Sequence, residues 1–336
     1  MASAQGSLFP DASGPSLRDV ADAIRLAGIE GLTEARRRSD QAKYQEVHVK
    51  SALNRAQGMP FKWALNPYRG CTHACEYCYA RKYQQHLELD AGDQFSTVIF
   101  VKTNLPQALA REVRKASWAR ETVAIGTATD PYQPIEGHYK LTRQSIEILT
   151  KAKTPLSIVT KGPMIVRDAD VLAASRDAAG CAVHMSVPCV DEEAWAKLEP
   201  GTASPAQRLR AVRYLVDAGI DTSVLMMPLV PGLTTSRSKI EETLLAIRDS
   251  GARAVGANVA RLDPAVREHF FRFLQREYPA LLPGYERLYV KTSPPRDYVD
   301  AIKATFADTR ARVIGPGARA VPGFGPPSAG ATKTYS

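Results

Sequence analysis

The chain has 336 residues, of which 44% are hydrophobic, enough to bury one large core and a small appendage. No apolar run reaches membrane-spanning length, and Met1 to Leu17 lacks a signal-peptide hydrophobic segment, so we expect a cytoplasmic protein without membrane contact. The formal net charge of +9 favours anionic partners such as nucleic acid, although the basic residues are spread along the chain.

Residues 1–58 carry no strong strand pattern and are expected to form an N-terminal arm. Leu17–Ala27 has apolar residues at helical spacing, and the charged stretch Ala35–Val47 suggests a solvated arm or an irregular wrap. In residues 59–260, short runs rich in β-branched residues alternate with longer amphipathic stretches. The predicted strands are Ala64–Arg69, Thr97–Lys102, Thr122–Thr127, Leu156–Thr160, Ala182–Val187, Thr222–Met227 and Ala254–Ala260. The predicted helices are Cys75–Leu89, Leu105–Ala116, Thr142–Lys153, Asp168–Ala178, Pro205–Ala218 and Ser236–Asp249.

This alternation of strands and helices predicts a parallel sheet built from βαβ units, and about six such units suggest a barrel, complete or open. Residues 261–313 are expected to form a C-terminal cap, with helices at His269–Tyr278 and Asp297–Phe306. Residues 314–336 are rich in Gly, Pro and Ala without periodicity, so we expect a disordered tail. The fold class is therefore α/β.

Three of the five cysteines lie within eight residues, in the order Cys71, Cys75 and Cys78. An odd total argues against a disulfide framework, and the C-x3-C-x2-C spacing is one thiolate short of a closed four-cysteine site. Because a [4Fe–4S] cluster normally takes four thiolates, three from the protein would leave one iron open to an external ligand. The alternative is zinc, which needs a second ligand pair, and the nearest candidates are His73 and His86.

The cysteine run resembles the cluster motif of the radical S-adenosylmethionine (radical SAM) enzymes. This resemblance implies a partial (βα)6 barrel with the cysteines after its first strand. It also implies two cofactors, a [4Fe–4S] cluster and S-adenosylmethionine, whose amino and carboxylate groups bind the open iron. In that family the reduced cluster cleaves S-adenosylmethionine to a 5′-deoxyadenosyl radical. The electron comes from a donor such as flavodoxin or ferredoxin.

Polar residues follow several predicted strands, at the sheet edge where parallel α/β folds place their chemistry. The loop after Thr122–Thr127 is long and polar, which would also suit an ordinary turn. Lys161 directly follows one strand, Ser186 lies at the end of another, and Cys189 comes just after it. A lysine placed directly after a buried strand would bring its ammonium to the mouth of a barrel.

These strand ends resemble the radical SAM branch that contains spore photoproduct lyase, a DNA repair enzyme. Its motif has a tyrosine on each side of the last cysteine, and Tyr77 and Tyr79 occupy both places here. The resemblance implies that Tyr77, Thr129 and Lys161 contact S-adenosylmethionine, with Tyr79 in catalysis. Ser186 is a further candidate for the cofactor's ribose or carboxylate.

One residue departs from the lyase pattern. The lyase has its hydrogen-donor cysteine two residues before the hydroxyl residue that Thr129 matches, and this chain has Thr127 there. Because a threonine O–H bond is too strong to replace a thiol as hydrogen donor, we do not expect the lyase's own relay. Cys189 could supply a thiol in catalysis, or it could simply be buried at a strand end. Cys181, at the opposite end of its strand, is expected to be structural.

The leading hypothesis is a radical SAM enzyme that acts on nucleic acid, in repair or modification. The enzyme alternative is radical chemistry on a small molecule or a peptide. A hypothesis of another class is a zinc-bearing, non-catalytic nucleic-acid-binding module. The sequence leaves the oligomeric state and the substrate bond open.

Overall fold

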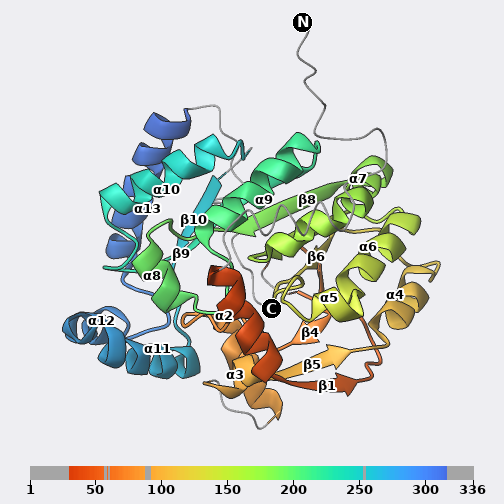
Figure 1. Cartoon of the computed structure of the whole chain (residues 1–336), viewed down its shortest axis with the longest axis horizontal. Helices are drawn as coiled ribbons and strands as arrows, with labels where there is room; N and C mark the ends of the chain where they lie inside the picture. The colour runs from red at the N-terminus through yellow and green to blue at the C-terminus, as the bar shows by residue number, and fades with distance from the viewer. Residues whose placement is uncertain (1–29, 57–58, 60, 88–91, 253–254, 316–336) are drawn as a thin grey trace, which may run out of the picture.

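The computed structural model describes residues 30–56, 59, 61–87, 92–252 and 255–315. Its centre is a seven-stranded sheet in the order β10-β9-β8-β7-β6-β3-β2 (Figure 1). The strands are β2 (Leu53–Arg55), β3 (Trp63–Leu65), β6 (Val123–Ile125), β7 (Leu156–Thr160), β8 (Cys181–Ser186), β9 (Asp221–Leu229) and β10 (Val255–Val259). All neighbouring pairs are parallel except β2 with β3, which confirms the α/β class. Among the described residues no pairing joins β10 to β2, so this sheet is open.

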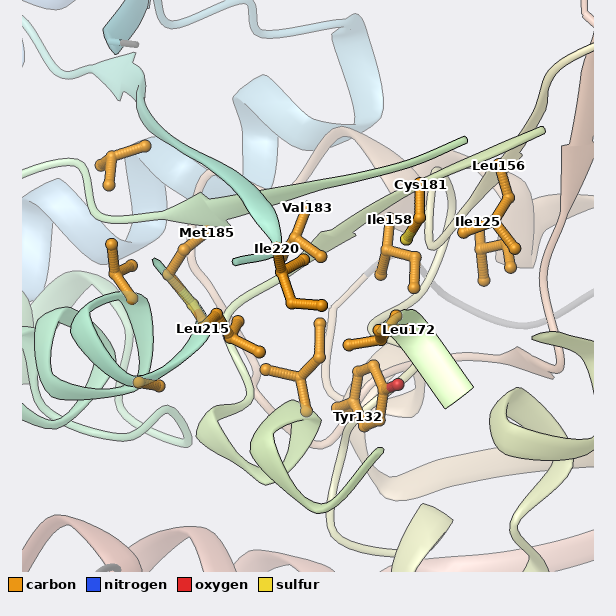
Figure 2. Close-up of a cluster of buried hydrophobic side chains, with 14 of the residues drawn as sticks. Ile125, Tyr132, Leu156, Ile158, Leu172, Cys181, Val183, Met185, Leu215 and Ile220 are labelled. Atoms are coloured by element: carbon orange, nitrogen blue, oxygen red, sulfur yellow. The ribbon is translucent and has the colours of Figure 1, made fainter. Parts of the chain in front are cut away.

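Amphipathic helices cover the outer face of the large sheet (Figure 1). They are α4 (Leu105–Val113), α6 (Leu141–Lys151), α7 (Ala169–Ala178), α9 (Pro205–Asp217) and α10 (Arg237–Asp249). Ile125, Ile158 and Val183 point from three adjacent strands into one apolar cluster that also holds Leu172 and Leu215 from the helices (Figure 2). Helix α9 begins sharply because Ser204 and Gln207 form a reciprocal capping box ahead of the apolar run.

A second, three-stranded sheet was not predicted. It contains β1 (Lys43–Val47), β5 (Val98–Lys102) and β4 (Tyr68–Arg69), in the order β1-β5-β4. The single predicted strand Ala64–Arg69 is wrong, because the chain leaves the large sheet after Leu65 and enters the small one at Tyr68. Pro67, which lacks an N–H for the ladder, lies at the break. The predicted strand Thr97–Lys102 exists as β5, but it belongs to the small sheet.

Two further expectations near the N-terminus need correction. The stretch expected to be an arm or an irregular wrap contains helix α2 (Glu30–Gln41) and strand β1, which pairs with β5 in parallel. The helix predicted from Cys75 begins only at Tyr79, as a 3-10 helix η1 (Tyr79–Leu87). The expected helix Leu17–Ala27, residues 1–29 and 57–58 of the expected N-terminal arm, and residues 316–336 of the expected C-terminal tail lie outside the described residues.

The C-terminal part contains α11 (Pro264–Glu277), α12 (Leu282–Leu288) and α13 (Arg296–Ile314), and the first and last of these confirm the two helices predicted there. Phe270, Phe273 and Tyr285 bury a separate apolar cluster that also includes Cys75. The shorter elements are α3 (Gln94–Thr97), α5 (Glu136–Tyr139), η2 (Pro163–Asp168), α8 (Glu192–Leu198) and η3 (Pro279–Leu281). None of the described helices combines the length and apolar character needed to cross a membrane.

Candidate active site

The three neighbouring cysteines lie in one loop, Gly70–Cys78, called the cysteine loop below. It runs from the end of β4 to the start of η1. Gly70 has a φ of +82°, and a Cβ there would lie 2.7 Å from the carbonyl oxygen of Val98, so glycine is required. Cys71 and Cys75 are buried and Cys78 is half-buried. The loop therefore keeps its thiols away from bulk water.

The cysteine loop is held by residues from distant parts of the chain. Arg81 donates from Nε to the carbonyl oxygen of Cys75 at 3.0 Å and from Nη2 to that of Ala74 at 2.9 Å. Gln133, fully buried, accepts from the backbone N–H of Thr72 at 3.1 Å. Gly201 donates its backbone N–H to the carbonyl oxygen of His73 at 3.0 Å. Because these hydrogen bonds are made to backbone atoms of the loop, they hold the loop independently of its own side chains.

Burial keeps the thiols of Cys71 and Cys75 protonated when no metal is bound. Burial raises the pKa of Cys71 well above its usual value, and Asp130 and the other two thiols add to the rise. Burial also raises the pKa of Cys75 to about 12, against the lowering influence of the Lys161 ammonium. The thiols must lose these protons to bind iron as thiolates, and the charge of the metal drives that loss.

Cys78 has neighbours in common with each of the other two cysteines. It packs in two apolar groups, one containing Cys71 and the other Cys75. In the part of the chain that the structure describes, no group of three or more His, Cys, Asp or Glu side chains gathers round one metal-ion position. A cubane cluster binds each thiolate to a different iron, so its ligands are spread more widely than those of a single ion.

The loop after β6 contacts the cysteine loop through Thr129 and Gln133. The Thr129 hydroxyl donates to the carbonyl oxygen of Gly70 at 2.6 Å and accepts from the Gln133 amide at 3.1 Å. The structure thus brings Thr129 to the cysteine loop and gives it a structural hydrogen bond there, and its contact with S-adenosylmethionine stays a prediction. The Thr129 hydroxyl oxygen has a second lone pair, which can still accept a hydrogen bond from a ligand.

Asp130, the next residue, joins three segments of the mouth. Its buried carboxylate accepts from the Thr160 hydroxyl and from the backbone N–H of Lys161, both at 2.7 Å. It also lies 3.3 Å from Nδ1 of His73. Burial opposes the charge of Asp130, but His73 and the hydrogen bonds prevail and lower its pKa to about 2. His73, considered above as a zinc ligand, therefore pairs with Asp130, and the side chain of His86 lies outside the described part.

Lys161 belongs to a buried charge network. Its Nζ lies 3.7 Å from Oε1 of Glu199 and 5.8 Å from the centroid of the Tyr77 ring. Glu199 also accepts from the Tyr77 hydroxyl and from Nη2 of Arg208, the latter at 2.6 Å. Burial would lower the pKa of Lys161, but Cys75 and Glu199 raise it overall, so the ammonium stays charged. Tyr77 and Lys161, predicted from separate motifs, therefore meet at one carboxylate.

Arg208 extends the network to the end of β8. It is fully buried, and Nη1 donates to the carbonyl oxygen of Ser186 at 2.7 Å. Its Nε has no hydrogen-bond partner among the described atoms. Two cations thus share the single carboxylate of Glu199, whose pKa they lower despite its burial. An unpaired buried donor and an excess positive charge suit an anionic ligand.

Ser186 and Cys189 lie close to this network. The Ser186 hydroxyl donates to the carbonyl oxygen of Met227 at 3.2 Å. Cys189 is buried in the same apolar cluster as Cys75 and Tyr77. Burial, with a further contribution from Glu199, raises the pKa of Cys189 to about 12, so its S–H is retained at neutral pH.

Two predicted residues stand apart from the network. Tyr79 is 45% exposed, and its ring meets Tyr83 edge to face at 6.4 Å. Thr127 accepts a hydrogen bond from the Asn66 amide at 3.2 Å, at the mouth end of β3 and β6. A catalytic part for Tyr79 stays a prediction. Cys181 begins β8 at the end away from the cysteines, where we expected it.

Sequence reasoning missed Asp130, Gln133, Glu199 and Arg208. Asp130 and Gln133 lie inside the polar loop that was noted as a site or a turn, so their positions carried some signal. Glu199 directly follows α8 and Arg208 lies on α9, so neither is at a strand end. Only the three-dimensional packing brings them to Tyr77 and Lys161.

Comparisons with known proteins agree with this geometry. The chain is 39% identical over 269 residues to an uncharacterized protein of Mycobacterium tuberculosis, covering 79% of this chain and 76% of the relative. It is 28% identical over 201 residues to the radical SAM Nalpha-GlyT isomerase of Pseudomonas phage M6, covering 58% of this chain and 39% of that protein.

Among solved structures, a spore photoproduct lyase with bound AdoMet and dinucleoside spore photoproduct superposes with a TM-score of 0.63 at 16% identity. The superposition covers 86% of this chain and 85% of the lyase, which shows a shared fold. The sequence model of the Radical SAM superfamily matches residues 65–247, more than half of the chain, from the last residue of β3 into α10. The chain therefore belongs to the radical SAM superfamily.

Proposed function

We propose that this radical SAM enzyme holds a [4Fe–4S] cluster on Cys71, Cys75 and Cys78 and cleaves S-adenosylmethionine reductively. The observation that best supports this proposal is that the three thiols lie in one loop held by hydrogen bonds, beside the network of Lys161, Glu199 and Arg208 with its excess positive charge. When bound, the cluster and S-adenosylmethionine supply a 5′-deoxyadenosyl radical. The electron would come from a donor protein such as flavodoxin or ferredoxin, in the cytoplasm.

The residues of the mouth would orient the cofactor. Lys161 and the free Nε of Arg208 would hold its carboxylate, because these two cations, one largely and one fully buried, share a single carboxylate. Tyr77, fixed by its hydrogen bond to Glu199, would pack beside it. Thr129 and Ser186 would offer hydroxyl oxygens to its polar groups. Burial of these side chains keeps water from a reactive radical.

For the substrate, we infer nucleic acid. The support is the net charge of +9 and the fold shared with a lyase whose solved structure contains a dinucleoside. Thr127 cannot act as the thiol donor of that lyase, so the reaction would end differently. Cys189 is our candidate hydrogen donor, since its thiol is protonated and lies in the same cluster as Cys75.

The test is anaerobic reconstitution of the full chain, followed by metal and product analysis. We expect about four iron and four sulfide per chain. After reduction, S-adenosylmethionine should yield 5′-deoxyadenosine, and a nucleic-acid substrate should raise that yield. Stoichiometric zinc without sulfide would contradict the proposal. Full cluster loading without any 5′-deoxyadenosine would contradict its catalytic part.

A further inference from the structure

One face of the small sheet gathers cations around an aromatic ring. Residues that pair directly across two strands share a face, and alternate residues of a strand return to it. Arg69 pairs with Phe100, and Lys102 follows two residues later on β5. On β1, Gln45 pairs with Phe100. Val47 and Val98 lie on this face as well, and we call its polar and aromatic members the basic face: Lys43, Gln45, Arg69, Phe100 and Lys102.

The two faces of the small sheet differ in what covers them. On the opposite face, Tyr68, Ile99 and Val101 are buried together in an apolar cluster. On the basic face, Phe100 is only partly buried and belongs to none of the hydrophobic clusters formed by the described residues. In the part of the chain that the structure describes, the ring is therefore backed by its sheet and left without an apolar layer above it.

The cations of the basic face lack carboxylate partners. Lys102 donates from Nζ to the carbonyl oxygen of Asn66 at 2.8 Å, and neither Lys102 nor Arg69 forms an ion pair with a described carboxylate. Burial, and after it the neighbouring Arg69 guanidinium, lowers the pKa of Lys102 to about 8. Two like charges held together without a counter-ion favour an external anion.

The basic face borders the mouth of the large sheet. Arg69 lies two residues before Cys71, at the entry to the cysteine loop. Asn66, whose carbonyl oxygen binds Lys102, uses its amide group to contact Thr127 at 3.2 Å and the backbone N–H of Ala128 at 2.8 Å. A ligand on Arg69 and Lys102 would therefore lie next to the loop after β6.

We propose that the basic face binds a single-stranded stretch of nucleic acid, with phosphates on Arg69 and Lys102 and a base stacked on Phe100. Single-strand binding sites combine cations that follow the backbone with aromatic rings that stack on bases, and this face offers both. The strand would thereby bring a neighbouring nucleotide to the cysteine loop. This inference rests on the proposed function and specifies its substrate class.

The test measures binding of a fluorescein-labelled oligothymidylate 12-mer to the full-length holoenzyme by fluorescence anisotropy. We expect the double variant Arg69→Gln/Lys102→Gln to bind at least about tenfold more weakly near 0.1 M salt. Losing two phosphate contacts on a single strand should reduce the slope of log K against log salt by about 1.4. The matched control is Arg114→Gln/Lys115→Gln, the same charge change on exposed residues at the end of α4, which should bind like wild type.

Phe100→Leu keeps an apolar strand residue and removes only the stacking ring. It should weaken binding roughly fivefold to hundredfold without changing the salt slope. Wild-type affinity should also fall as pH rises from 7 to 9, because Lys102 loses its charge, and this fall should vanish in Lys102→Gln. The side chains beside Lys102 on this face are Arg69 on β4, Phe100 on β5 and Val47 on β1, and of these three Arg69 alone carries a charge.

Three outcomes would overturn the proposal that the basic face binds nucleic acid. The first is that both Arg69→Gln/Lys102→Gln and Phe100→Leu bind the oligothymidylate as tightly as wild type, and the second is that the control variant loses as much affinity as they do. The third is that a wild-type enzyme that cleaves S-adenosylmethionine does not bind the oligothymidylate at all. Failure of wild type to make 5′-deoxyadenosine would instead contradict the proposed function, whatever the oligonucleotide result. Thermal unfolding of each variant checks that a loss of binding is not a loss of fold.

Discussion

The outer face of the large sheet and the mouth at its strand ends are built from opposite chemistries. Ile125, Ile158 and Val183 pack against helices in an apolar layer (Figure 2). At the mouth, the charged side chains of Glu199 and Arg208 are buried almost as deeply. Apolar burial stabilises a fold, whereas buried ion pairs seldom contribute net stability. This difference indicates that the outer face maintains the fold, whereas the mouth is arranged for a ligand.

The largest effect expected at the mouth is from Cys75→Ala. Each cysteine is one of only three protein anchors, so the variant should lose the iron–sulfur colour and all S-adenosylmethionine cleavage. Iron analysis and 5′-deoxyadenosine formation measure both losses. Cys181→Ala, on the outer side of the same sheet, is the control and should keep both. A colourless Cys181→Ala protein would show that general unfolding explains the loss.

Glu199→Gln tests whether the mouth depends on its charge network. Removing one partner of a buried pair leaves an uncompensated charge, which typically costs about 3–5 kcal/mol of unfolding free energy. Both Lys161 and Arg208 would lose their shared carboxylate. The exposed ion pair Glu193–Lys197 provides the control, because Glu193→Gln should change stability by less than about 1 kcal/mol. Denaturant unfolding compares the two, and equal small effects would mean that the network is dispensable.

Ile158→Ala probes the other side of the comparison. It removes a fully buried side chain from the apolar layer and should destabilise the fold by about 2–5 kcal/mol. Below its unfolding transition, the variant should still bind the cluster, since Ile158 does not contact the mouth network. If iron content fell in proportion to stability, the two regions would not be separable.

Lys161→Ala should act on the ligand more than on the fold. A charged hydrogen bond contributes about 1.5–3 kcal/mol, so affinity for S-adenosylmethionine should fall about tenfold to hundredfold with the cluster intact. Equilibrium binding to the loaded enzyme and iron content are measured together. Unchanged affinity with unchanged turnover would remove Lys161 from the site.

The smallest expected effect is on product distribution. In Cys189→Ala, 5′-deoxyadenosine should still form, while products of the nucleic-acid substrate become mixed, because the candidate hydrogen donor is missing. Thr127→Ala should change little, since its hydroxyl only accepts a hydrogen bond from Asn66. Chromatography of the products distinguishes the two variants. A single clean product from Cys189→Ala would exclude this thiol as the donor.

The comparison also explains what could be predicted from the sequence. Strands such as Leu156–Thr160 are short runs rich in β-branched residues between amphipathic helices, so the sequence pattern located them. The spacing of the cysteines likewise identified the cysteine loop. Glu199 carries no such local signal, because its neighbours Tyr77 and Lys161 are distant in the sequence. The small sheet was missed because β4 has only two residues and β1 is charged.

The long-range clamps on the cysteine loop have a consequence for biosynthesis. Gln133 comes 61 residues after Thr72, and Glu199 comes 122 residues after Tyr77. At about 5–20 residues per second, a ribosome needs roughly 6–24 s to make the stretch from Tyr77 to Glu199. During that interval the three thiols are already made, whereas Gly201 and Arg208 are not. The nascent chain thus has a period in which iron and sulfide can reach the loop before Gly201 and Arg208 close over it.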